Sequence, residues 1–198
     1  MKTLNDFKNI EHLLNWLYHN TKGTSYQEDE KFYFPEEIFS NKKCNCFDIA
    51  FAVHLFCENR DIFNKITCTS FDYRIPGKKI QNNGHIVCVF QDLQRYGKWY
   101  IANIDGINEN FDMIFGGYES YTETIEKFSY VYLPMLVKWI KDERKCNFDV
   151  LNYHYSVYKE SDINKVERLY YAKTNVNNKQ EMLTQFEKNA GIIKLKMK

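Results

Sequence analysis

Between residues 46 and 59 the chain reads CFDIAFAVHLFCEN, and apolar side chains fall on nearly every side of a helical projection of this segment. A helix that is apolar all round is buried on all sides, so the segment predicts a central helix enclosed by the rest of the fold. Asn45 is the expected N-cap, and Asp48 places an acid in the first turn, where the helix dipole favours it. The apolar positions are Phe47, Ile49, Phe51, Val53, Leu55 and Phe56.

The segments around this helix predict an α+β fold, because one further helix precedes it and mainly strands follow it. Residues 3–21 carry a helical apolar stripe that opens on an expected capping box of Thr3 and Asp6, and residues 22–45 are an expected long loop. Gly97 is the expected turn of an antiparallel hairpin. The expected strands are 65–73, 85–91, 98–105 and 148–158, and the expected later helices are 122–129 and 135–144 on either side of Pro134, 161–173, and 178–189 capped by Gly191.

Length and charge narrow the classes of protein that this chain can belong to. A chain of 198 residues predicts a single domain, 1–198, large enough to bury a sizeable core. The 27 Lys and Arg residues nearly balance the 26 Asp and Glu residues, which leaves a net charge of +1 and no field to attract nucleic acid. No apolar run is long enough to span a membrane, so we expect neither a nucleic-acid nor a membrane partner. The oligomeric state has no signal in the sequence.

The cysteines indicate a reducing compartment. There are six, and the N-terminal segment lacks the uninterrupted apolar stretch of an export signal, so we expect reduced thiols and a cytoplasmic location. Cys44 and Cys46 are separated by one residue, which is not the spacing of a zinc knuckle, and no second pair follows. We therefore expect no metal and no other cofactor.

Cys46 is the candidate nucleophile because it opens the buried helix. A helix N-terminus carries partial positive charge and free backbone N–H groups, and both favour a thiolate and can hold an oxyanion. Lys42 and Lys43 lie just upstream. The alternative is that Cys46 is a structural core cysteine. Cys44, in the preceding loop, is the rival nucleophile, and we expect Cys57, Cys68 and Cys88 in the core.

His85 is the candidate base, since it opens the strand that should pair with residues 98–105. Side chains alternate along a strand, so Asn103 and Asp105 share one face at the end of that second strand. Either can accept a hydrogen bond from the imidazole and fix its tautomer. Asp105 is preferred because a carboxylate better stabilises an imidazolium, and Asn103 remains the alternative. His54, farther along the buried helix, is expected to be a structural histidine.

These segments together resemble the transglutaminase-like superfamily over about residues 40–110. Cys46-Phe47-Asp48-Ile49-Ala50 resembles its C-x-D-x-A nucleophile motif, Gly84-His85-Ile86-Val87 its histidine-led strand, and Gly97-Lys98-Trp99-Tyr100 the strand that leads to its acid. The family acid usually lies four residues after the tryptophan, which here is Asn103, whereas Asp105 lies six after it. Residues 111–198 form an extension that the resemblance does not cover.

The resemblance implies a papain-like α+β fold and acyl transfer through a thioester on Cys46. Water as acceptor makes a protease or amidase acting on a protein or peptide, and an amine makes a transglutaminase. Two alternatives stay open. Some family members have lost catalysis, which would leave a binding domain on the same scaffold. A coenzyme A-dependent acyltransferase shares the triad, but the sequence has no clear nucleotide-binding loop.

Overall fold

The computed structural model describes residues 2–23, 32–104, 112–172 and 191–194. The helices and strands are 3-10 turns η1 (Leu4–Asp6) and η2 (Leu93–Arg95), helices α1 (Ile10–Asn20), α3 (Pro35–Asn41), α4 (Cys46–Glu58), α5 (Tyr121–Arg144) and α6 (Glu160–Ala172), and strands β1 (Lys22–Gly23), β2 (Lys43–Cys44), β3 (Asn64–Arg74), β4 (Gln81–Asp92), β5 (Lys98–Ala102), β6 (Ile114–Tyr118), β7 (Asp149–Val157) and β8 (Gly191–Lys194). They form an α+β fold.

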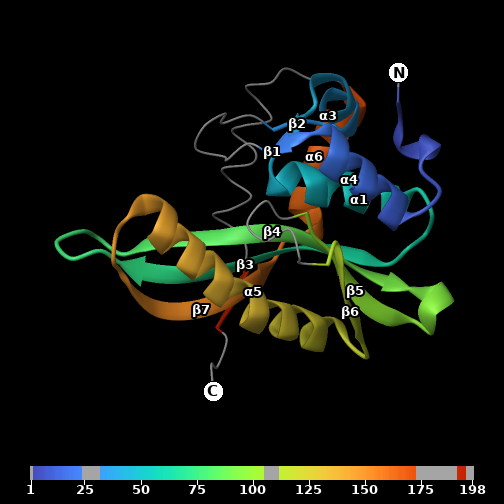
Figure 1. Ribbon diagram of the computed structural model, residues 1–198. Coiled ribbons are helices and arrows are strands. Elements are labelled where there is room, and N and C mark those ends of the chain that lie inside the picture. Colours follow the sequence, from blue (N-terminus) through green and yellow to red (C-terminus); the bar gives the residue numbers. More distant parts are fainter. Residues whose placement is uncertain (1, 24–31, 105–111, 173–190, 195–198) are drawn as a thin grey trace.

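A six-stranded antiparallel sheet in the order β6-β5-β4-β3-β7-β8 divides the molecule into two helical layers (Figure 1). Helices α1, α3, α4 and α6 cover one face, and α5 covers the other. Alternate residues of β4 serve the two layers: Ile86 and Cys88 face α4, whereas Val87 and Val89 face α5. Each face of β4 is therefore buried against a different core.

The prediction of a buried central helix is confirmed by α4. Every residue from Phe47 to Cys57 is buried, and the helix packs against β3 and β4 on one side and α1 and α3 on the other. The Asn45 side chain accepts hydrogen bonds from the N–H groups of Phe47 and Asp48, so the predicted N-cap is also confirmed. The start of α4 is thereby fixed at Cys46.

The N-terminal third departs from the sequence expectation at two points. The predicted helix 3–21 is interrupted: η1 ends at Asp6, and α1 starts anew at Ile10 because Asn9 caps it by accepting the N–H of His12. The predicted loop 22–45 contains helix α3, which begins with Pro35 at its first position.

Pro134 does not separate two helices, since α5 runs without a break from Tyr121 to Arg144. The proline is exposed, so the hydrogen bond that it removes belongs to the solvent-facing side of the helix. The apolar stripe on the opposite side, which includes Phe128 and Tyr132, stays packed on the sheet and holds both halves in one helix.

The predicted strands 65–73, 85–91 and 148–158 correspond to β3, β4 and β7, and the hairpin at Gly97 joins β4 to β5. Strands β6 and β8 were not predicted, and β8 begins at Gly191, the expected helix cap. The predicted helix 178–189 lies outside the described residues. Within the described ranges, none of the helices is long and apolar enough to cross a membrane.

Candidate active site

Cys46 is the first residue of α4, and its surroundings are held by a closed set of hydrogen bonds. Asp48 is fully buried, and its carboxylate accepts the N–H of Asn45 at 2.8 Å and the N–H of Tyr33 at 3.0 Å. Together with the Asn45 cap, these bonds form a capping box that also ties residue 33 to the helix start. Cys46 as a whole residue is partly exposed.

Burial, with a smaller contribution from the Asp48 carboxylate, raises the pKa of the Cys46 thiol to about 11. The backbone N–H groups of Ile86, Phe47 and Cys46 act in the opposite direction and lower it. These donors are directed at the sulfur from the helix start and from β4. At neutral pH the sulfur is therefore a protonated thiol surrounded by groups able to stabilise an anion.

The hydrogen bond from Ile86 places Cys46 at an open edge of β4. Strand β5 ends at Ala102, which pairs with Cys88, so β5 does not reach Ile86. Ladder N–H groups point sideways within the sheet, and the Ile86 N–H donates to the Cys46 sulfur instead of to a strand. The sulfur thus occupies the position at which the neighbouring strand is missing, one residue along the chain from His85.

His85 is held by Asn103, as the sequence allowed. The Nε2 of His85 lies 2.6 Å from Oδ1 of Asn103, and the backbone N–H of Asn103 donates to the carbonyl of Met113 at 2.9 Å. An amide oxygen only accepts, so Nε2 carries the proton and Nδ1 keeps its lone pair, which is the tautomer that a base requires. Asp105, the preferred third member, lies outside the described residues.

An aromatic column covers the imidazole on the α5 side of the sheet. The ring of His85 stacks on Tyr132 with centroids 4.7 Å apart, and Tyr132 stacks on Phe128 at 5.0 Å. Burial lowers the pKa of His85 to about 4, although the hydrogen bond to Asn103 raises it. The ring is therefore neutral over most of the pH range.

The structure brings the predicted catalytic residues near one another without closing the chain of hydrogen bonds. His85 and Asn103 lie on the α5 face of the sheet, whereas Cys46 packs with the α4 core and meets β4 at its edge. Among the hydrogen bonds of the described residues, none joins Cys46 to His85. His85 and Asn103 are thus hydrogen-bonded to each other, whereas Cys46 contacts β4 through the backbone N–H of Ile86.

The other cysteines are less suited to nucleophilic attack. All six lie within the described ranges and are free thiols. Cys44, the rival nucleophile, is buried in β2 against Thr21 at 3.2 Å, and burial raises its pKa to about 11 without the helix N-terminus that Cys46 has. Cys57 and Cys88 are fully buried between α4 and β4, as predicted.

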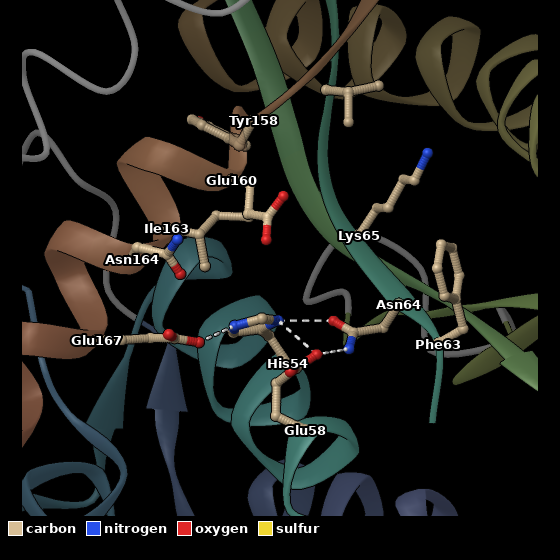
Figure 2. Close-up of a pocket in the computed structure, with 11 residues that line it drawn as sticks. His54, Glu58, Phe63, Asn64, Lys65, Tyr158, Glu160, Ile163, Asn164 and Glu167 are labelled. Carbon is tan, nitrogen blue, oxygen red and sulfur yellow. Dashed lines mark hydrogen bonds and ion pairs between the residues drawn. The ribbon is translucent and has the colours of Figure 1, made fainter. Parts of the chain in front are cut away.

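A second polar cluster lies around His54, on the same helix as Cys46. The imidazole hydrogen-bonds to Glu167 at 2.6 Å through Nε2 and to Asn64 at 2.7 Å through Nδ1, beside a pocket of about 510 Å³ (Figure 2). The sequence predicted a structural role for His54 but gave no signal for Glu167, which is 113 residues away. In the part of the chain that the structure describes, no group of three or more His, Cys, Asp or Glu side chains is placed to hold a metal ion.

In comparisons with known proteins, no family model matches the sequence and no curated protein matches it.

Proposed function

We propose that this protein is a cysteine-dependent acyl-transfer enzyme of the transglutaminase-like, papain-like type, acting on an amide or ester bond of a protein or peptide. Cys46 is the nucleophile, His85 the general base and Asn103 the residue that orients it. The proposal rests on the 2.6 Å hydrogen bond between His85 Nε2 and Asn103, because this bond leaves Nδ1 of His85 as the basic nitrogen. The next residue along the chain, Ile86, donates its backbone N–H to the Cys46 sulfur.

In this mechanism the Cys46 sulfur attacks the acyl carbonyl at the edge of β4. The His85 ring, which lies on the α5 face in the resting structure, must turn Nδ1 towards that edge to take the thiol proton. The new C–S bond makes a tetrahedral oxyanion, which collapses to a thioester as His85 returns the proton to the departing amine or alcohol. Water then releases the acid, or an amine takes the acyl group. Backbone N–H groups at the start of α4 are suited to stabilise the oxyanion.

Because Cys46 and His85 are both uncharged in the resting site, we expect the proton to move from the thiol to the imidazole during the attack. Burial raises the pKa of the thiol to about 11 and lowers the pKa of the imidazole to about 4, so neither group is ionised near neutral pH. The base must be neutral to act. We therefore expect the acylation rate to hold from neutral pH down towards about pH 4 and to fall as His85 becomes protonated.

The test is acylation by p-nitrophenyl acetate, whose activated ester needs no specific recognition of the acyl chain. Wild-type protein should release a burst of nitrophenolate and carry an acetyl group on Cys46, found by intact-mass measurement and peptide mapping. Cys46→Ala should lose both signals. Cys44→Ala is the matched control and should keep them, because Cys44 lies two residues upstream and is buried in β2. A folded wild-type protein without acetyl-Cys46 would refute the proposal.

The second candidate function is a binding domain that keeps this scaffold without catalysis. It is favoured by one observation, namely that no hydrogen bond among the described residues joins the Cys46 thiol to the His85 ring. For such a domain, Cys46 would alkylate with iodoacetamide no faster than the other five cysteines, and His85→Gln would leave its rate unchanged. For the enzyme, the His85→Gln substitution should slow acylation by the ester.

A further inference from the structure

The pocket beside His54 is lined by α4, the start of β3, the end of β7 and α6, which are distant from one another in the sequence. Helix α4 contributes His54 and Glu58, the start of β3 contributes Asn64 and Lys65, and α6 contributes its first two turns (Figure 2). Glu167 reaches the imidazole from α6, on the side opposite to Asn64. The imidazole of His54 thus extends from α4, the helix that starts at Cys46, to Glu167 on α6.

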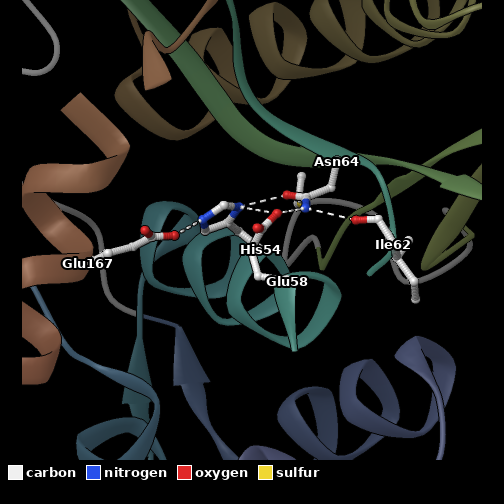
Figure 3. Close-up of polar contacts among 6 residues, drawn as sticks. His54, Glu58, Ile62, Asn64 and Glu167 are labelled. Carbon is white, nitrogen blue, oxygen red and sulfur yellow. Dashed lines mark hydrogen bonds and ion pairs between the residues drawn. The ribbon is translucent and has the colours of Figure 1, made fainter. Parts of the chain in front are cut away.

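Both ring nitrogens of His54 face oxygen acceptors. The amide of Asn64 is fixed in orientation, because its Nδ2 donates to Glu58 at 2.6 Å and to the carbonyl of Ile62 at 3.1 Å, which turns its oxygen towards Nδ1 (Figure 3). The carboxylate of Glu167 meets Nε2. Only an imidazolium donates from both nitrogens, so the two contacts are satisfied together when His54 carries two protons.

Two carboxylates lie close to the ring. Glu58, from α4 itself, lies 3.9 Å from Nδ1, and Glu167 of α6 is bonded to Nε2. Glu160 of α6 and Lys65 of β3 also line the pocket. From β4 the nearest titratable group is the Cys88 thiol, which contacts the Asn64 oxygen at 3.7 Å. The side chain of His54 is 7% exposed, so solvent screens the ion pair with Glu167 only weakly.

Helix α6 is otherwise attached to the molecule mainly by apolar contacts. Ile163 and Val166 are buried in the core that contains α4, and Tyr170 packs on Phe34. The hydroxyl of Tyr170 donates to Glu36 of α3 at 2.5 Å. Among the described residues, the bond between His54 and Glu167 is a polar contact that joins the middle of α6 to α4, so its loss would weaken the docking of this helix without opening the main core.

We propose that His54 and Glu167 form a pH-sensitive clasp that holds α6 against α4 while the imidazole is doubly protonated and loosens it when the proton leaves. The neutral ring must direct a lone pair at either Glu167 or Asn64, and both are acceptors. The docking of α6 is therefore strongest on the acid side and weakens as the pH rises. This clasp stands independently of any thiol chemistry at Cys46.

Hydrogen–deuterium exchange of the intact protein tests the clasp, with peptides covering α6 compared between about pH 5.5 and about pH 8. After correction for intrinsic exchange, α6 should lose about tenfold of its protection at the upper end, the effect of one charge-assisted hydrogen bond. Peptides of α5 serve as the internal reference, because that helix lies on the other face of the sheet. Unchanged protection of α6 across this range would overturn the proposal.

Two variants separate the clasp from a general effect of pH. In Glu167→Gln the amide can donate to an unprotonated Nε2 while Nδ1–H donates to Asn64, so the neutral ring is satisfied and the pH dependence of α6 should disappear. Glu160→Gln removes the same charge from the same helix without touching a bond to His54, and it should behave like wild type. Equal pH dependence in wild type and Glu167→Gln would also overturn the clasp. His54→Gln should likewise be insensitive to pH, provided that it folds.

Discussion

His85 of β4 and His54 of α4 are nearly equal in burial but have different hydrogen-bond partners. His85 is 9% exposed and His54 is 5% exposed. One amide oxygen and a stacked aromatic ring surround His85, and burial lowers its pKa to about 4. His54 faces a carboxylate and an amide oxygen on its two nitrogens. The two histidines therefore differ in the number and charge of their acceptors and not in their burial.

The comparison also assigns different roles to the two ends of α4. At its N-terminus lies Cys46, for which we propose the neutral His85 of β4 as the base. Two turns farther along the helix, His54 has both nitrogens engaged and is suited to hold α6 in place. Substituting one histidine, or its hydrogen-bond partner, while the other histidine serves as the reference separates these two roles.

The largest expected difference concerns acylation by p-nitrophenyl acetate. His85→Gln should slow the formation of acetyl-Cys46 by about a hundredfold or more, because a positioned general base contributes on this scale. His54→Gln should stay within about threefold of wild type, since His54 is not near the reacting sulfur. Stopped-flow release of nitrophenolate measures both rates. Equal acylation rates in His85→Gln and His54→Gln would contradict the assignment of His85 as the base and His54 as a structural histidine.

The pH dependence of folding should also separate the two residues. The folded pKa of His85 is lowered to about 4 from an unfolded value of about 6.5, so the unfolded chain binds the proton first as the pH falls. The stability contributed by a neutral His85 is complete above about pH 6.5 and is lost as the pH falls to about 4, by ~3 kcal/mol. Urea unfolding of wild type and His85→Gln at several pH values measures this difference.

The same experiment on His54→Gln should give a slope of the opposite sign. The clasp requires the proton, so the stability difference between wild type and this variant should decrease as the pH rises. Two slopes of the same sign would mean that the acceptors around His54 do not hold it in the charged form.

A smaller effect is expected from the amide that orients His85. Asn103→Ala should slow acylation about tenfold, which corresponds to ~1.4 kcal/mol and to one buried hydrogen bond. Asn103→Asp keeps the acceptor and adds a negative charge, so it should retain most of the rate and raise the pH below which the rate falls. A pH–rate profile for each variant distinguishes orientation of the ring from simple loss of folding, because only a change at the imidazole moves that profile.

The sequence was sufficient for the features that depend on local order. Apolar side chains all round residues 46–59 predicted α4, and Asn45 was recognisable as its cap. The hairpin at Gly97 indicated that Asn103 and Asp105 would both lie near His85, but it did not decide between them. The structure pairs His85 with Asn103. These predictions rely on neighbours within one element or one hairpin.

Features that depend on distant neighbours were not accessible in this way. His54 and Glu167 are 113 residues apart and meet only because α6 packs against α4, and no apolar pattern in the sequence predicts this contact. The burial of Cys46 depends on β4 and on the place where β5 ends, so the sequence suggested a lowered thiol pKa while the structure raises it. Pro134 predicted a break that packing of α5 on the sheet overrides.

The smallest expected effect concerns Asn45, the residue that caps the N-terminus of α4. Asn45→Ala removes the acceptor for two helix N–H groups and should lower the free energy of unfolding by ~1 kcal/mol, measured by urea denaturation. Asn45→Ser is the matched control, because a hydroxyl restores the acceptor and should recover most of the loss. The disturbance lies in the first turn, so Cys46 should acylate more slowly in the alanine variant while the exchange of α6 at its His54 contact stays unchanged. If the acylation of Cys46 and the exchange of α6 change to the same extent, α4 transmits the loss of its cap along its length, and the two sites are coupled.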